Sequence, residues 1–159
     1  MNLQHFIKDF VKRDLSSGKE VSKLQLLLMR ALYLLTFLSL GYSTWSEIIN
    51  PSETWGAYDG VTYSFWATYS VLMGLGVRFP LKMLPLLLLQ LFYKSVWLIG
   101  IAYPMWSTNT LDPTSEGLLR PFLIAIPIDL LVIPWAYIWR NYIKTLFRFK
   151  SIKHIQSLY

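Results

Sequence analysis

Four stretches of the chain are almost continuously apolar, and polar segments that hold Gly, Pro and charged residues separate them. They cover about residues 24–42, 61–77, 81–103 and 118–139. A helix rises about 1.5 Å per residue, so stretches of this length match a hydrocarbon core of about 30 Å. They show no strict apolar–polar alternation, which favours membrane helices over barrel strands. The pattern predicts an all-α fold, with residues 1–159 forming a single domain, a polytopic four-transmembrane-helix bundle.

The two ends of the chain have a different, amphipathic pattern. In residues 1–18, apolar side chains such as Phe6 and Phe10 recur at helical spacing, and Lys8 and Lys12 lie on the other face. This pattern predicts an interfacial helix on the membrane surface, and a helix packed under the bundle is the alternative. Residues 140–159 also mix basic and apolar positions and predict a basic cytoplasmic tail.

Lys and Arg are distributed unevenly along the chain. Of the 15, 13 lie before residue 31, between residues 78 and 82, or after residue 139. The loops 46–60 and 105–117 contain no Lys or Arg and hold five carboxylates. Because cytoplasmic loops of membrane proteins are enriched in Lys and Arg, this pattern predicts that both termini are cytoplasmic (N-in/C-in). The net charge of +6 then indicates the lipid bilayer, with anionic lipid at the cytoplasmic face, as the partner rather than nucleic acid.

Some of these basic side chains lie close to the cytoplasmic ends of the predicted spans. A long basic side chain can keep its stem against apolar surface while its charged end reaches the phosphate layer. The candidate lipid-headgroup anchors are Arg30, Arg78, Lys82, Arg140 and Lys144.

Composition narrows the possible chemistry. Charged residues make up 15% of the chain, against about 25% in an average soluble domain. The chain has no Cys, and its two His, His5 and His154, lie in opposite tails. Thiol chemistry, Cys-based metal sites and a buried bis-His haem are therefore excluded. No nucleotide-binding fingerprint is present. We expect no metal, no cofactor and no catalytic residues, and the residue types present favour a protein that is not an enzyme.

Two ionisable residues, Lys94 and Asp129, fall well inside predicted spans. Lys94 lies ten residues before Pro104 on a helix that runs outward, and Asp129 lies nine residues after Arg120 on a helix that runs inward. Both are therefore about 15 Å below the outer surface. A charge inside a membrane is costly and usually pairs or lines a cavity. We predict an ion pair between Lys94 and Asp129.

Several neighbours extend this pair into a candidate ligand-binding site. Gln90 lies one helical turn before Lys94, and Trp97 lies three residues after it. The predicted pocket lies between the second, third and fourth spans, with Lys94 and Asp129 as its floor and Tyr69, Gln90 and Trp97 as its walls. Such a pocket would bind a polar headgroup or relay a proton. The alternative is a structural ion pair that fixes the register of the helices.

Proline and glycine predict local features of the helices. Pro127 and Pro134 flank Asp129 and predict kinks in the fourth span. Gly74 and Gly76 predict close packing near the inner end of the second span.

The third and fourth spans carry a resemblance. Residues 76–90, the pairs Lys94-Ser95 and Trp97-Leu98, and Ile133-Pro134-Trp135 resemble a family of small four-helix bacterial inner-membrane proteins. The likeness covers about residues 74–142. It implies a multi-pass protein of the bacterial cytoplasmic (inner) membrane and implies no activity. DoxX-like proteins share the four-helix architecture, and a distant relation to them stays open.

Two classes of function remain open. In the first, the protein binds a lipid or another small molecule in a pocket within the bundle. In the second, it is an accessory or scaffolding subunit of a larger membrane complex, with no chemistry of its own. The expected partner is a membrane protein or, in a homo-oligomer, a second copy of the chain. Proton-coupled transport is a third interpretation, and it would need an oligomer to form a path.

Overall fold

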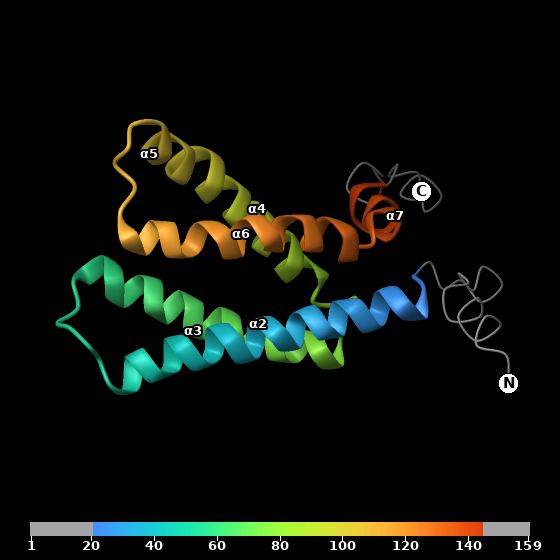
Figure 1. Ribbon diagram of the computed structural model, residues 1–159. Coiled ribbons are helices and arrows are strands. Elements are labelled where there is room, and N and C mark those ends of the chain that lie inside the picture. Colours follow the sequence, from blue (N-terminus) through green and yellow to red (C-terminus); the bar gives the residue numbers. More distant parts are fainter. Residues whose placement is uncertain (1–20, 145–159) are drawn as a thin grey trace, which may run out of the picture.

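The computed structural model describes residues 21–144, which are helical and contain no strand. The elements are α2 Lys23–Ile49, α3 Ala57–Arg78, α4 Leu84–Trp97, η2 Leu98–Ala102, α5 Tyr103–Ser107, α6 Pro113–Val132, α7 Trp135–Ile138 and η3 Trp139–Ile143. Helices α2 and α3 form one hairpin, and the segment from α4 to α5 forms a second with α6 (Figure 1). Both ends of the described chain and the α3–α4 turn lie at one end of the molecule (Figure 1).

Two of these helical segments, α2 and Leu84–Ser107, are long and apolar enough to cross a membrane. A third candidate span consists of α6 together with Trp135–Ile143, if this bent pair is counted as one. Helix α3 has 22 residues but is less apolar. The protein is thus all-helical over its described residues and has two or three helices suited to a membrane.

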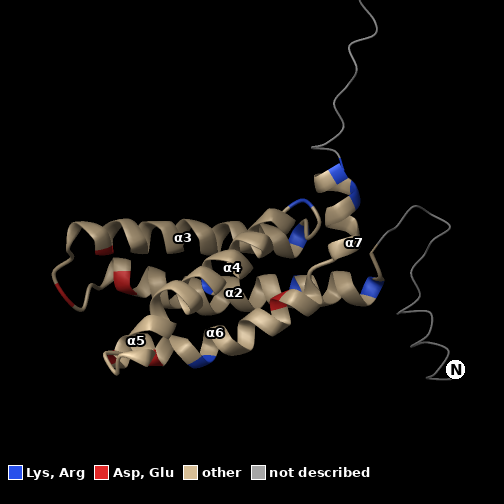
Figure 2. Cartoon of the chain, turned by 90° about the horizontal axis from the view of Figure 1, so that it is seen from above, with Lys and Arg blue, Asp and Glu red and all other residues tan. Residues whose placement is uncertain are grey.

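Charge separates along the long axis of the molecule. Figure 2 shows most Lys and Arg around α7, the α3–α4 turn and the start of α2, and most Asp and Glu near the two opposite loops. The predicted interfacial helix at residues 1–18 lies outside the described residues, as does the tail beyond Lys144.

The α3–α4 turn is held by a tyrosine from the first helix. The Tyr33 hydroxyl donates a buried hydrogen bond of 3.1 Å to the carbonyl of Pro80. Its ring lies against Gly76, where an added Cβ would fall 2.3 Å from a ring carbon. Gly76 therefore permits the close helix packing predicted from the sequence. The apolar core lies near this turn and includes Tyr33, Met73, Leu87 and Ile133.

The third apolar segment extends beyond its predicted end. The third stretch was predicted to end at about residue 103, but the helix continues through Pro104 to Ser107. The π-helical η2 ends two residues before Pro104, and the N–H of its C-cap residue Tyr103 donates to the Leu98 carbonyl. Local π-helical turns rearrange the hydrogen bonds that proline disrupts.

The fourth apolar segment is not one continuous span over 118–139. Helix α6 ends at Val132, and the chain bends by 63° before it continues from Trp135. Proline disfavours helical backbone in the residue before it, and Ile133 is indeed extended, with ψ of 125°. The kink predicted at Pro134 is therefore a break, whereas α6 continues through Pro127.

The two loops that hold Asp and Glu but no Lys or Arg are shorter than the sequence predicted, because α2, α3, α5 and α6 extend into them. Helix α6 starts early because Asp112 caps it, accepting hydrogen bonds from the Thr114 and Ser115 N–H groups at 2.9 and 3.0 Å. The Ser115 hydroxyl donates a further bond of 2.6 Å. The hydroxyl bond and these backbone bonds hold the pKa of Asp112 below its usual range.

Candidate functional site

The predicted ion pair is present. Lys94 Nζ lies 3.6 Å from Asp129 Oδ2, joining α4 to α6 in the middle of the second hairpin. Asp129 is fully buried, and Lys94 retains 8% of its surface exposed. Two opposite charges removed from water need additional polar partners, because the attraction alone seldom offsets the cost of desolvation.

Gln90 supplies such partners to Asp129. Its amide Nε2 donates to both carboxylate oxygens, at 2.9 and 3.2 Å. Its Oε1 accepts from the Thr36 hydroxyl at 3.3 Å and from the Tyr69 hydroxyl at 3.4 Å. Because Thr36 belongs to α2 and Tyr69 to α3, the amide of Gln90 links all four long helices through one buried polar cluster.

Aromatic side chains surround the cationic member of the pair. Lys94 Nζ lies 5.8 Å from the centroid of the Phe122 ring, within the range of a cation–π interaction. Tyr93 and Trp97 pack edge-on against the same ring, at 5.9 and 5.0 Å between centroids. Phe122 thus covers the ammonium group on the α6 side.

A groove of about 570 Å³ reaches this cluster from the side of α2 and α6. Lys94 and Gln90 lie in its wall, together with the hydroxyl-bearing side chains Thr36, Ser39 and Ser43. The Ser39 and Ser43 hydroxyls donate to carbonyls of their own helix, at 2.7 and 3.1 Å. Their oxygen lone pairs can still accept hydrogen bonds. Apart from Tyr93, which carries a phenol hydroxyl, the rest of the wall is apolar and includes Leu32, Leu35, Leu40, Pro121, Ile124, Ala125 and Ile128.

The geometry differs from the predicted pocket. The groove lies between α2, α4 and α6, whereas the prediction placed the pocket between the second, third and fourth spans. Of the predicted lining residues, Lys94 and Gln90 border the groove. Asp129 lies behind them, and Tyr69 is buried on α3, where its hydroxyl also donates to Leu86 at 2.9 Å. Trp97 packs against the Phe122 ring and does not line this groove.

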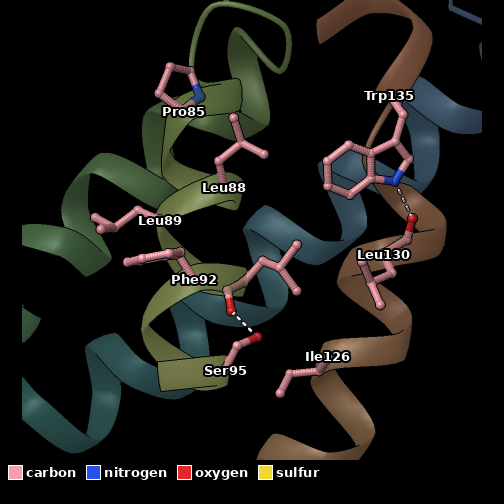
Figure 3. A pocket seen from close by; sticks show the side chains of 9 residues that line it. Pro85, Leu88, Leu89, Phe92, Ser95, Ile126, Leu130 and Trp135 are labelled. Atoms are coloured by element: carbon pink, nitrogen blue, oxygen red, sulfur yellow. Dashed lines mark hydrogen bonds between the residues drawn. The ribbon is translucent and has the colours of Figure 1, made fainter. Parts of the chain in front are cut away.

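A second groove, of about 650 Å³, lies between α4 and α6 (Figure 3). Its walls are apolar, and its single hydroxyl, on Ser95, donates to the Leu91 carbonyl at 2.7 Å. At one end the Trp135 indole Nε1 donates to the Leu130 carbonyl at 2.8 Å (Figure 3). This larger groove suits an acyl chain but has no side chain that distinguishes one ligand from another, so the groove at Lys94 is the better candidate site.

Sequence reasoning missed four residues of the site, three on the first span and one on the fourth. Thr36, Ser39 and Ser43 follow helical spacing on the first span and indicate a polar face there. Phe122 carries no comparable signal, because an aromatic residue beside Pro121 is equally typical of a membrane interface.

The candidate lipid anchors fall into two groups. Arg30 and Arg78 border one small notch between α2 and α3. Lys82 and Arg78 both lie near the Phe79 ring, at 5.5 and 5.9 Å. Arg140 and Lys144 lie on the segment after the Pro134 break and are exposed. Figure 2 shows Lys and Arg around the α3–α4 turn and α7, the parts of the chain that hold or adjoin Arg78, Lys82, Arg140 and Lys144.

No protein-family model, curated protein or solved structure matches the chain. The resemblance to small bacterial inner-membrane proteins therefore stays a prediction.

Proposed function

We propose that the chain is a multi-pass protein of the bacterial inner membrane, in which α2, α3, α4–α5 and α6–α7 each cross the bilayer. The basic end then lies on the cytoplasmic side, in agreement with the distribution of Lys and Arg. The polarity of α3 does not oppose this placement. Its Thr62, Ser64, Thr68 and Ser70 hydroxyls all donate to carbonyls of the same helix, at 2.7–2.9 Å.

We further propose that the groove at Lys94 binds a lipid or another small amphipathic molecule. An ammonium group has three N–H donors, and Asp129 neutralises its charge without enclosing it. The site therefore favours a ligand whose carbonyl, hydroxyl or other acceptor oxygen faces Lys94. The apolar body of the ligand would lie along side chains such as Leu35 and Ile124.

The observation that carries this proposal is the position of the Lys94 side chain. It is charged, whereas the other side chains in the groove wall are apolar, carry a hydroxyl or, in Gln90, carry an amide. A wholly structural ion pair needs no such opening, because burial in a filled core would serve the register of the helices equally well.

Native mass spectrometry of the full chain, extracted in mild detergent, tests the proposal. Wild type is expected to carry a bound small molecule. Ser39→Leu narrows the groove and should lose this molecule without a fall in melting temperature. Ser64→Leu makes the same change on α3, outside the groove, and should retain it. Equal occupancy in both variants, or an empty wild type, would refute a ligand at this groove.

One observation favours the accessory-subunit alternative. Every buried side-chain nitrogen or oxygen among residues 21–144 has a hydrogen-bond partner, so no buried polar atom there needs a ligand. In that case the exposed apolar faces of the helices would contact a partner protein or a second copy. Measuring the mass of the particle purified in mild detergent distinguishes the two, because a subunit is expected to retain its partner and a ligand-binding monomer is not.

A further inference from the structure

A notch of about 390 Å³ between the basic ends of α2 and α3 is bordered by two arginines. Arg30 contributes from α2, and Arg78 is the last residue of α3. The surface between them is formed by Gly74 and Val77. Both arginines are exposed, so their guanidinium groups are accessible from outside the helix pair.

We propose that Arg30 and Arg78 together bind the phosphate of an anionic phospholipid. This site is separate from the groove at Lys94 and does not depend on a ligand there. It rests only on the placement of the helices in a membrane.

The electrostatics of the notch favour an anion. Among residues 21–144, no Asp or Glu forms an ion pair with either arginine. Two cations that border one concavity repel each other, and an anion between them removes that repulsion. A guanidinium group offers a planar fork of N–H donors that fits two oxygens of a phosphate, so two arginines from different helices can hold one phosphate from two sides.

A third cation lies close to the notch. Lys82 Nζ and Arg78 Cζ lie 5.5 and 5.9 Å from the centre of the same Phe79 ring. The ring itself is 45% exposed. The α3–α4 turn therefore adds positive potential next to the two arginines and places an aromatic side chain at the depth of a lipid headgroup.

The surroundings of the notch favour a lipid over free phosphate. Leu34 lies one helical turn from Arg30, and Leu75 lies one turn from Arg78, each on the side toward the middle of its helix. These leucines are 44% and 45% exposed. A phospholipid whose phosphate is held by the arginines would thus have apolar surface next to its acyl chains. Free phosphate would gain nothing from this surface.

Lipid binding to the full chain in detergent micelles, measured by native mass spectrometry with added phosphatidylglycerol or phosphatidylcholine, tests this site. Wild type is expected to prefer phosphatidylglycerol. Each of Arg30→Gln and Arg78→Gln should weaken that binding about tenfold, and the double variant more, because each removes a charge-assisted pair of hydrogen bonds. The double variant with Arg30→Lys and Arg78→Lys keeps both charges but loses the fork of N–H donors. Its affinity for phosphatidylglycerol should lie between that of wild type and that of the double Gln variant.

The matched control is Arg120→Gln, which removes one exposed arginine on α6, far along the chain from the notch. It should bind phosphatidylglycerol as wild type does, and melting temperatures should show that all variants are folded. The proposal is wrong if the double Gln variant binds as wild type does, or if Arg120→Gln weakens binding equally. It is also wrong if inorganic phosphate competes as strongly as the lipid, because the site would then be one for free phosphate.

Discussion

The ammonium group of Lys94 and the carboxylate of Asp129 lie 3.6 Å apart, the first at the wall of a groove and the second fully buried behind it. Removal of one member leaves the other charge buried without its partner, which costs about 3–5 kcal/mol. We therefore expect Lys94→Met and Asp129→Leu each to lower the thermal stability of the protein in detergent. The double variant should recover much of the loss.

A double-mutant cycle of melting temperatures measures this coupling. The loss of thermal stability in Lys94→Met is reduced by Gln90, because its amide continues to donate to the Asp129 carboxylate. Asp129→Leu should therefore be the more damaging single change, since it leaves both Lys94 and the Gln90 amide without their acceptor. If the losses in the two single variants simply add in the double variant, the pair contributes no stability of its own.

The packing of Tyr33 on Gly76 gives a second prediction. Gly76→Ala would place a methyl group 2.3 Å from the ring, and the ring has little freedom to move because its hydroxyl is bound to Pro80. Overpacking of this kind costs about 1–3 kcal/mol. Gly117→Ala is the control, because its added methyl group meets no atom within 4 Å and removes a glycine from α6. Chemical unfolding should show a loss for the first variant and none for the second.

Trp135 gives a third prediction. Pro134 has no N–H, so the Leu130 carbonyl lacks its usual helical donor, and the Trp135 indole donates to it instead. Trp135→Phe keeps an aromatic ring and loses this bond, which should cost about 1 kcal/mol and speed amide hydrogen exchange around the α6–α7 break. Trp139→Phe, at another exposed tryptophan in the following segment, should leave exchange at the break unchanged. Equal exchange in both variants would mean that the indole bond does not stabilise the break.

The long elements of this fold follow from its hydrophobic pattern, and their ends do not. The apolar stretches identify α2, α4 and α6, because continuous apolar length is a strong signal. A helix that meets a proline can continue through a wider, π-helical turn or it can break. The chain continues through Pro104 and breaks at Ile133–Pro134, so the residue type alone does not predict the outcome.

The candidate site was predictable in part. The equal depth of Lys94 and Asp129 follows from counting residues along two antiparallel helices, and the ion pair confirms it. The position of the groove does not follow from such counting, because it depends on how α2 is rotated about its axis relative to α4 and α6. A helix that contacts both lipid and protein is apolar on most of its sides, so its residue pattern is a poor guide to that rotation, and Thr36 was missed for this reason.

The cap at Asp112 gives a fourth prediction, in pH dependence. Its folded-state pKa is depressed by the Ser115 hydroxyl and by the backbone N–H bonds. The cap therefore stabilises the start of α6 at pH values above the ordinary pKa of an aspartate, and this effect is lost as the pH falls through the depressed folded-state pKa. The protection of the Thr114 and Ser115 amides, measured as exchange relative to the intrinsic rate at each pH, should fall on acidification. Asp112→Asn keeps an acceptor without titrating, so its exchange should show no such transition, and a transition retained in Asp112→Asn would exclude Asp112 as its source.

The proposed topology gives a fifth prediction. The chain contains no Cys, so any introduced cysteine is the only one and its labelling reports a single position. Glu53→Cys lies in the loop after α2, Lys82→Cys in the α3–α4 turn, and Thr110→Cys in the loop before α6. If all four segments cross the bilayer, a membrane-impermeant maleimide applied to intact spheroplasts should label positions 53 and 110. Position 82 should react only after lysis. The pair 53 and 82 is decisive for the less apolar helix α3, which alone separates them. Labelling of both from the same side would mean that α3 lies along the membrane, whereas labelling of 82 alone would reverse the orientation inferred from the Lys and Arg distribution.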